Sequence, residues 1–227
     1  MSWWLPPQAS NFAPGIDTMF LVILVLTGIA FVLVEVALVI FLVKYRQRPG
    51  RKAFYTHGST PAEVIWTAIP AIAMVILGIV SNSLWVTIKG RQSVPADAYP
   101  LAVHAKQFEW WITYPGLDGK LGDDDDFKIR NKLYVPAGRP IVLTLTSEDV
   151  IHSFYVPQFR VRQDVVPGME IRVWFIATVP GTYEIACSQL CGMGHYKMRA
   201  QVFVQTQADY DAWLQQQAAE AKGAPTS

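Results

Sequence analysis

The chain has 227 residues, is 52% hydrophobic and carries a formal net charge of +1. This length suits one ordinary domain plus a smaller unit. The near-neutral charge, without a basic stripe, argues against a nucleic-acid-binding protein. Hydrophobic residues are concentrated in about the first ninety positions, whereas the remainder has the composition of an aqueous domain.

Two long apolar segments are predicted to cross a membrane. Met19–Val43 contains Glu35 as its only charge, and Val64–Val86 contains none. Each exceeds the roughly 20 residues needed to span the hydrocarbon core. The first is too long for a signal peptide and has no basic segment before it. Glu35 is expected to face protein or to stay protonated, because a charge inside the bilayer costs on the order of 2.5–3.5 kcal/mol.

The basic residues predict the orientation of this helical pair. The connecting segment begins with KYRQRPGRK, residues 44–52, whereas residues 1–18 contain no Lys or Arg. The positive-inside rule therefore places the loop of residues 44–63 in the cytoplasm and both termini outside. We expect an integral protein of a bacterial plasma (inner) membrane, with its later residues on the periplasmic side.

After Lys89 the sequence changes to short alternating runs. LAVHAKQFEWWITY, NKLYVPAG, RPIVLTLTS, VIHSFYVP, EIRVWFIA, GTYEIACS and MRAQVFVQT are each predicted to be a strand. Pro and Gly residues separate several of them. Seven or more short strands indicate an all-β Greek-key sandwich or barrel. Thr206 is a suitable N-cap for a short C-terminal helix that ends at Gly223.

One loop between two of these strands carries a cluster of soft metal donors. The stretch EIACSQLCGMGHYKMR contains both cysteines of the chain, Cys187 and Cys191, followed by His195 and Met198. A disulfide is the simplest alternative in an oxidising compartment. Thiolate, imidazole and thioether groups together favour copper, however, and His152 begins an earlier strand. A second thiolate would allow two sulfurs to bridge two metal ions.

This pattern resembles the dinuclear copper (CuA) centre of subunit II of haem–copper cytochrome c oxidases. SEDVIHSFYVPQFRVRQDVVPGM, PAEVIWTAIPA and KQFEWWITYPG are also similar to that family, and the resemblance spans about residues 15–215. It implies two N-terminal transmembrane helices, a cupredoxin-like Greek-key domain and a short C-terminal helix. The expected limits are 1–16 for an exported tail, 17–88 for the membrane hairpin, 89–206 for the copper domain and 207–227 for the terminal helix and tail.

The resemblance also implies a ligand set. His152 and His195 would supply imidazole nitrogens, while Cys187 and Cys191 would bridge two copper ions. Met198 would be a weak axial donor, and the backbone carbonyl of Gln189 would be the corresponding donor to the other copper. The family commonly has Glu at position 189, where its carboxylate reaches a Mg²⁺ or Mn²⁺ ion shared with subunit I. An amide is a weaker ligand for a hard cation, which puts that second metal site in doubt.

Other residues receive roles from the same resemblance. Phe108 takes the place of the family's first Trp in a Gln-Trp-x-Trp pattern, and Trp110 matches the second, which indicates electron uptake or simply cover for the metal loop. Glu148 and Asp149 match acidic positions that dock a basic cytochrome c. Glu63 matches the mouth of the K proton pathway, although the helix dipole alone would also favour Glu there.

The implied function is electron uptake by a terminal oxidase. The chain would accept electrons from cytochrome c, or from a c-type haem subunit, and pass them to haem in subunit I. There O₂ is reduced to water with proton pumping, so this chain is not catalytic alone. Expected partners are subunit I, further subunits such as subunit III, and membrane lipid. The alternatives are a CuA subunit of a nitric oxide reductase-type complex and a membrane-anchored copper carrier or assembly factor.

Overall fold

The computed structural model describes residues 4–90 and 92–223, so the parts of the predicted segments at 1–3, 91 and 224–227 lie outside the described residues. The chain forms two compact units. One is Gly15–Val86, and the other combines the N-terminal segment up to Pro14 with the chain from Thr87 onwards.

Two long helices make up most of the first unit: α1 (Ala13–Lys44) and α2 (Thr60–Lys89). Both extend beyond the apolar runs expected at 19–43 and 64–86, because polar and small residues continue each helix past its apolar centre. Gly15 lies against Leu84, where a Cβ would be 3.3 Å from Leu84 Cδ1. Most of the other apolar side chains of both helices are exposed within the chain, as expected for helices that face lipid or other subunits.

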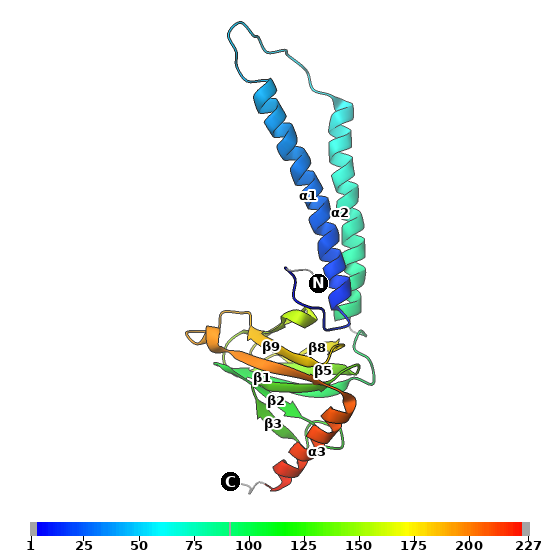
Figure 1. Ribbon diagram of the computed structural model, residues 1–227, viewed down its shortest axis with the longest axis vertical. Helices are drawn as coiled ribbons and strands as arrows, with labels where there is room; N and C mark the ends of the chain where they lie inside the picture. Colours follow the sequence, from blue (N-terminus) through cyan, green and yellow to red (C-terminus); the bar gives the residue numbers. More distant parts are fainter. Residues whose placement is uncertain (1–3, 91, 224–227) are drawn as a thin grey trace. The chain divides into compact units, whose positions relative to one another are not determined.

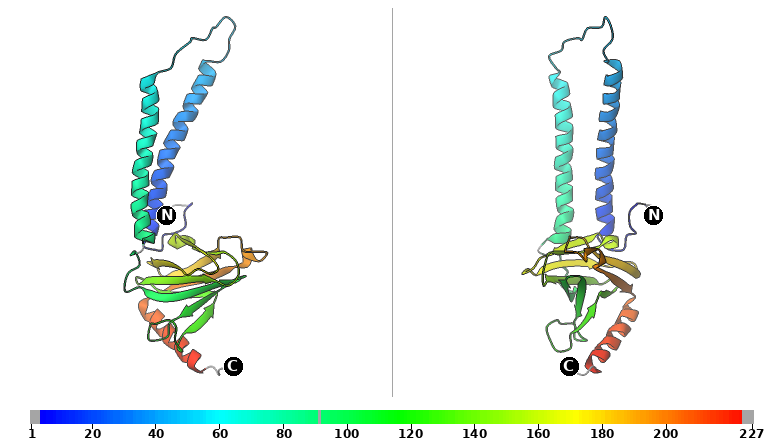
Figure 2. Two further views of the ribbon diagram at one scale, coloured as in Figure 1. Left: turned by 180° about the vertical axis from the view of Figure 1, so that it is seen from behind. Right: turned by 90° about the vertical axis from the view of Figure 1, so that its left-hand side faces the viewer.

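Two five-stranded sheets form the second unit (Figures 1 and 2). Their orders are β3-β2-β1-β5-β8 and β4-β10-β9-β6-β7. The strands are β1 (Tyr99–Lys106), β2 (Glu109–Tyr114), β3 (Phe127–Arg130), β4 (Lys132–Pro136), β5 (Pro140–Ser147), β6 (His152–Val156), β7 (Val161–Val165), β8 (Ile171–Ile176), β9 (Gly181–Cys187) and β10 (Arg199–Gln205), with short 3₁₀ turns η1 (Pro157–Phe159) and η2 (His195–Lys197).

Alternation along the strands builds the core between these sheets. In β1, Leu101, Val103 and Ala105 are buried, while the intervening residues are partly exposed. β5 pairs with β1 in parallel and buries Ile141, Leu143 and Leu145 in the same way. The inward residues of the two sheets thus fill one apolar layer. The predicted all-β cupredoxin-like class is confirmed.

The sequence-based strand assignment was wrong in detail at three places. LAVHAKQFEWWITY is a hairpin rather than one strand, because Lys106 pairs with Glu109 and the chain reverses at Gln107 and Phe108. β3 and β7 were not predicted, since each is short and contains two charged residues. The reversal places Phe108, which the sequence connects with electron uptake, at the tip of a hairpin.

The C-terminal helix begins as predicted. α3 (Gln207–Gly223) follows Thr206, whose Oγ1 accepts a hydrogen bond from the Asp209 amide at 3.3 Å. Trp213 on this helix stacks on Tyr134 of β4, with 4.4 Å between the ring centroids. The helix therefore covers part of the β-domain.

The N-terminal segment is also attached to the β-domain. The Asn11 amide donates to the Ile176 carbonyl at 3.0 Å, and the Thr178 amide donates to the Ala9 carbonyl at 3.0 Å. Phe12 packs edge-on against Trp174 with ring centroids 4.7 Å apart. These contacts keep the start of the chain on the same side of the membrane as the β-domain, in agreement with the orientation expected from the basic loop.

Candidate metal centre

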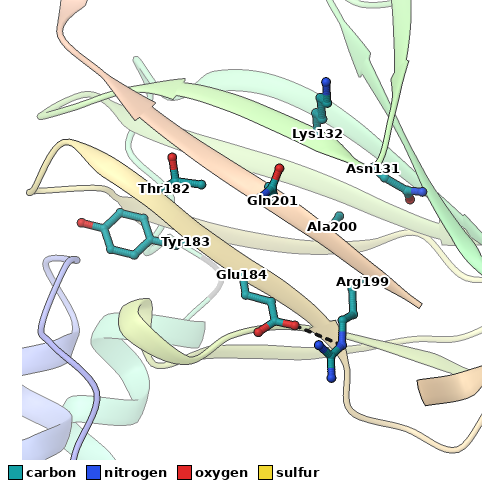
Figure 3. A pocket seen from close by; sticks show the side chains of 8 residues that line it. All are labelled: Asn131, Lys132, Thr182, Tyr183, Glu184, Arg199, Ala200 and Gln201. Atoms are coloured by element: carbon teal, nitrogen blue, oxygen red, sulfur yellow. Dashed lines mark ion pairs between the residues drawn. The ribbon is translucent and has the colours of Figure 1, made fainter. Parts of the chain in front are cut away.

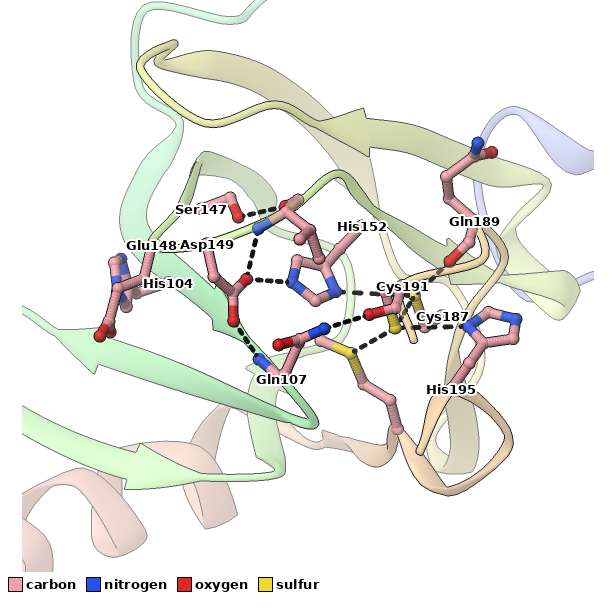
Figure 4. Close-up of polar contacts among 12 residues, drawn as sticks. His104, Gln107, Ser147, Glu148, Asp149, His152, Cys187, Gln189, Cys191 and His195 are labelled. Carbon is pink, nitrogen blue, oxygen red and sulfur yellow. Dashed lines mark hydrogen bonds and ion pairs between the residues drawn. The ribbon is translucent and has the colours of Figure 1, made fainter. Parts of the chain in front are cut away.

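The pairing of β6, β9 and β10 brings together the side chains proposed as metal ligands. Cys187 ends β9, and its amide donates to the Met198 carbonyl at 3.1 Å, which closes the intervening loop just before β10. β6 pairs antiparallel with β9, with Phe154 opposite Cys187, and this register brings His152 to the base of the loop. Figure 4 shows the loop and the start of β6 converging on the two sulfur atoms.

The donor atoms form a continuous group. The two cysteine Sγ atoms are 3.8 Å apart. His152 Nδ1 is 3.9 Å from Cys187 Sγ, and His195 Nδ1 is 3.5 Å from Cys191 Sγ. Met198 Sδ lies 3.8 Å from Cys191 Sγ. His152, Cys187, Cys191 and Met198 are all buried.

These separations fit ligands that share metal ions. A disulfide would require sulfurs about 2.05 Å apart, and both cysteines are free. Two donors each bonded at about 2.0–2.3 Å to one tetrahedral ion lie ~3.6 Å from each other. The donor set of two thiols, two imidazoles and a thioether also has the softness that suits copper. The residues present therefore fit a copper centre in both spacing and chemistry.

The two thiols differ in acidity before any metal binds. Burial opposes ionisation of Cys187, but the hydrogen bond with His152 and those with nearby backbone outweigh it and lower its pKa to about 6. Burial raises the pKa of Cys191 to about 12, and the neighbouring Cys187 charge adds to this effect. One thiolate is thus ready for a metal near neutral pH, whereas the second would ionise when a cation arrives.

Asp149 holds the imidazole of His152 in place. Its carboxylate accepts a hydrogen bond from His152 Nε2 at 2.8 Å and another from the Gln107 amide at 2.7 Å. Burial raises the Asp149 pKa, but these bonds and one from Val150 outweigh it and keep the pKa below its usual range. With Nε2 bonded to Asp149, Nδ1 is the ring nitrogen that faces Cys187, and it would become the metal donor on losing its proton. This is the arrangement by which carboxylates orient metal-bound histidines.

The tip of the β1–β2 hairpin contacts the metal loop. The Gln107 side-chain amide donates to the Cys191 carbonyl. Phe108 lies so close to the loop that a Cβ on Gly194 would be 2.4 Å from its ring. Gly192 has φ of +129°, which favours glycine, and a Cβ there would lie 2.7 Å from Gln107 Nε2. Two glycines therefore allow the hairpin tip to touch the metal loop.

Gln189 presents its main chain to the cluster and its side chain elsewhere. The backbone oxygen lies 3.2 Å from Cys187 Sγ. In Figure 4 the side-chain amide points away from the sulfurs. The predicted carbonyl donor is thus in a suitable position, and the amide is separate from the soft donor set.

The remaining predicted residues lie at different distances from the cluster. Trp110 is fully buried and packs edge-on against His152, with 6.1 Å between the ring centroids. Glu148 is exposed and pairs with His104 Nε2 at 3.2 Å. Glu63 lies in the first turn of α2, in the other compact unit.

The metal loop itself carries exposed apolar residues. Leu190, Met193 and Tyr196 are 78%, 95% and 68% exposed, respectively. Apolar side chains gathered on a surface in this way indicate a contact site for another protein. The sequence alone assigned these residues no role, because their exposure depends on how the loop folds.

Sequence reasoning missed the bracing residues. It assigned no role to Gln107, and it interpreted Asp149 only as a docking acid. The contact between Gln107 and Cys191 joins residues 84 positions apart, so no local pattern reveals it. Asp149 precedes His152 by three residues, a spacing that could have suggested the contact.

A shallow pocket elsewhere on the β-domain has a different chemical character. It has a volume of about 600 Å³ and lies over β4, β10 and β9 (Figure 3). Lys132 lines it, together with the ion pair of Glu184 and Arg199, whose oxygen and nitrogen are 3.2 Å apart. Its lining contains neither thiol nor imidazole, so this pocket does not offer the soft donors found in the metal loop and His152.

Comparison with known proteins points to one family. The family model described as cytochrome c oxidase subunit II, periplasmic domain, matches residues 87–205, and the corresponding transmembrane-domain model matches residues 1–84. An alternative cytochrome c oxidase subunit 2 of Bradyrhizobium diazoefficiens is 35% identical over 240 residues, covering 95% of this chain and 84% of the relative. A cytochrome c oxidase subunit 2 of Thermostichus vulcanus is 33% identical, covering 93% of this chain and 78% of the relative.

A solved structure agrees with this match. The crystal structure of the periplasmic domain of subunit II of cytochrome oxidase from Bradyrhizobium japonicum is 28% identical. Its TM-score is 0.50, and the match covers 58% of this chain and 99% of that one.

Proposed function

Because the chain belongs to the cytochrome c oxidase subunit II family, we propose that its metal loop and His152 hold the dinuclear copper centre through which the oxidase takes up electrons. The observation that carries this proposal is the sulfur pair, 3.8 Å apart, with an imidazole beside each sulfur. The six proposed donors are His152, Cys187, the Gln189 carbonyl, Cys191, His195 and Met198.

The family sets the wider role. The chain is the electron-accepting subunit of a haem–copper oxidase, with two membrane helices and a periplasmic domain in a bacterial inner membrane. It works with the haem-bearing subunit I, and the family implies copper. This match favours an oxidase over a nitric oxide reductase-type complex or a copper carrier. We place the copper domain at residues 89–206, the membrane hairpin at 17–88, the exported tail at 1–16 and the terminal helix and tail at 207–227.

Cys187, Cys191 and the other proposed donors would hold copper, which when bound would supply single-electron transfer with little change in bonding. The protein keeps the donors in place for this. Asp149 fixes the ring of His152, and Gln107 fixes the carbonyl of Cys191. Burial of both sulfurs and of Met198 excludes water from the cluster. Such a prearranged set needs little reorganisation when its charge changes.

The electron donor would dock around the loop. Leu190, Met193 and Tyr196 offer an apolar surface, and the exposed carboxylate of Glu148, next in sequence to Asp149, would add negative charge. We propose a cytochrome c, or a c-type haem subunit, as the partner, with complementary charge raising its association rate. Phe108 touches the metal loop and is the proposed point of electron uptake. Trp110 would influence electron uptake through its ring contact with His152. Asp149 is already bonded to His152, so it would contribute to docking only through its negative charge.

Two further roles concern other interfaces. Glu63 would admit protons at the cytoplasmic start of α2, where it is exposed within the chain. The Gln189 amide would be a poor ligand for Mg²⁺ or Mn²⁺, so we propose that this second metal site is weak or lost. Subunit III would complete the assembly.

Substitution in the purified oxidase tests the copper assignment. Cys191→Ser should remove one bridging sulfur, so that copper content falls and oxidation of cytochrome c is lost. Glu184→Gln, which changes an exposed ion pair on the same sheet, is the matched control and should keep both. Unchanged copper content and cytochrome c oxidation in Cys191→Ser would refute the proposed function.

A further inference from the structure

The end of α1 and the loop that joins it to α2, which Figure 1 shows as a ribbon, contain five basic residues. They are Lys44, Arg46, Arg48, Arg51 and Lys52. No Asp or Glu occurs between Glu35 and Glu63, and none of the five forms an ion pair within residues 4–90 and 92–223. The chain thus leaves this positive charge without an acidic partner of its own.

The loop is folded back onto the end of the helix. Arg51 Nη1 donates to the Lys44 carbonyl at 2.8 Å, one of the last helix carbonyls that lack a partner within the helix. The Arg51 amide donates to the Arg48 carbonyl at 3.2 Å, which forms a turn through Gly50. The Arg51 guanidinium carbon also lies 5.9 Å from the centre of the Tyr45 ring. Arg51 therefore gives the loop its shape and keeps the basic residues together.

This folding creates a pocket. It has a volume of about 580 Å³ and is lined by Arg46, Arg48, Arg51 and Lys52 together with Tyr45 and Phe54. Pockets of this size accommodate small ligands. Guanidinium groups match phosphate oxygens with paired hydrogen bonds, and the lining includes no acid that would repel an anion.

The position of the pocket indicates the source of the phosphate. The apolar run of α1 continues to Val43, so residues 44 onwards begin at the membrane surface. Phe54 and Tyr55 are 90% and 78% exposed, and aromatic residues are enriched at this level of a bilayer. Basic pockets at the cytoplasmic end of a membrane helix suit anionic lipid headgroups. We propose that this basic pocket binds the headgroup of an anionic phospholipid such as phosphatidylglycerol.

This site is more than a signal for membrane orientation. Orientation depends on the number of Lys and Arg residues near the helix ends, so Lys serves as well as Arg. Binding in a shaped pocket also depends on the guanidinium fork. Replacement of Arg by Lys therefore separates the two explanations. The proposal does not depend on the copper centre.

The test uses the whole oxidase in nanodiscs of phosphatidylcholine that contain a photoactivatable phosphatidylglycerol. Labelling of the loop peptide is measured against the fraction of this lipid. Arg46→Gln/Arg48→Gln removes two charges but leaves the Arg51 bond to Lys44 intact. Each charge near a membrane surface changes lipid affinity about fivefold, so the double variant should require roughly 30-fold more lipid for half-labelling.

Two further variants serve as controls. Lys120→Gln/Lys128→Gln lowers the net charge equally on the exported domain and should label like the unmodified oxidase. Arg46→Lys/Arg48→Lys keeps the charge and should label more weakly than the unmodified oxidase. Copper content should be unchanged in all variants, because none of the substituted residues is a proposed copper donor.

Three results would overturn the proposal. The first is loop labelling by phosphatidylglycerol no stronger than by a matched phosphatidylcholine probe. The second is labelling of Arg46→Lys/Arg48→Lys equal to that of the unmodified oxidase, which would reduce the pocket to an orientation signal. The third is displacement of the lipid by inorganic phosphate at equal concentration, which would indicate a site for a free anion.

Discussion

Replacing Asp149 should weaken copper binding, although Asp149 is not itself a proposed copper donor. The His152 side chain is fully buried, and its Nε2 donates to Asp149 at 2.8 Å. Asp149→Ala leaves that N–H without this acceptor, which costs about 1–3 kcal/mol. Loss of a carboxylate that orients a histidine ligand typically lowers metal affinity 10–100-fold, or ~1.4–2.7 kcal/mol. Copper affinity of Asp149→Ala should therefore fall by about 10–100-fold.

The assay is a competition titration of copper on the exported domain, with an unfolding curve for each variant. Asp149→Asn keeps an oxygen acceptor and should fall between the unmodified domain and Asp149→Ala. The neighbouring Glu148→Gln is the matched control, because Glu148 contacts His104 and not the donor cluster. Equal copper affinity in Asp149→Ala and the unmodified domain would refute the reasoning, as would an equal loss in Glu148→Gln.

Three other predictions concern the loop. Gly194→Ala should destabilise the domain by about 1–3 kcal/mol in denaturant unfolding, because its Cβ would be 2.4 Å from the Phe108 ring, and Phe108→Ala should remove most of that cost. In the reduced, metal-free domain, ultraviolet thiolate absorbance should appear as pH rises through about 6 and be absent below it, and Cys187→Ser should abolish this step. Met198→Leu should retain copper and change its reduction potential, because a thioether donor is replaced by a side chain of similar volume without one; loss of copper would contradict this.

The sequence predicted the fold class and the identity of the donor cluster for separate reasons. Two uninterrupted apolar runs allow few structures other than membrane helices, and alternating strands indicate a sandwich. In the metal loop, Cys187, Cys191, His195 and Met198 are close in sequence, so their spacing alone restricts their geometry. The structure places them together with His152, while their role as copper ligands stays a prediction.

Contacts between segments that are distant in the chain could not be predicted from the sequence. The reversal at Gln107 and Phe108 falls within LAVHAKQFEWWITY, which contains no Gly or Pro, so no turn signal marked it. Without that hairpin, the bond from Gln107 to Cys191 and the packing of Phe108 on the loop could not be inferred. The attachment of Asn11 to Ile176 likewise depends on tertiary packing, since a short polar segment before a membrane helix has no periodic pattern.

Metal content and electron paramagnetic resonance of the freshly isolated oxidase test the central claim most directly. The account predicts two copper ions on this subunit and a hyperfine pattern from one electron shared by both nuclei, with neither cysteine available to alkylation until copper is removed. A disulfide between Cys187 and Cys191 in active enzyme, or the signal of a single copper nucleus, would contradict it.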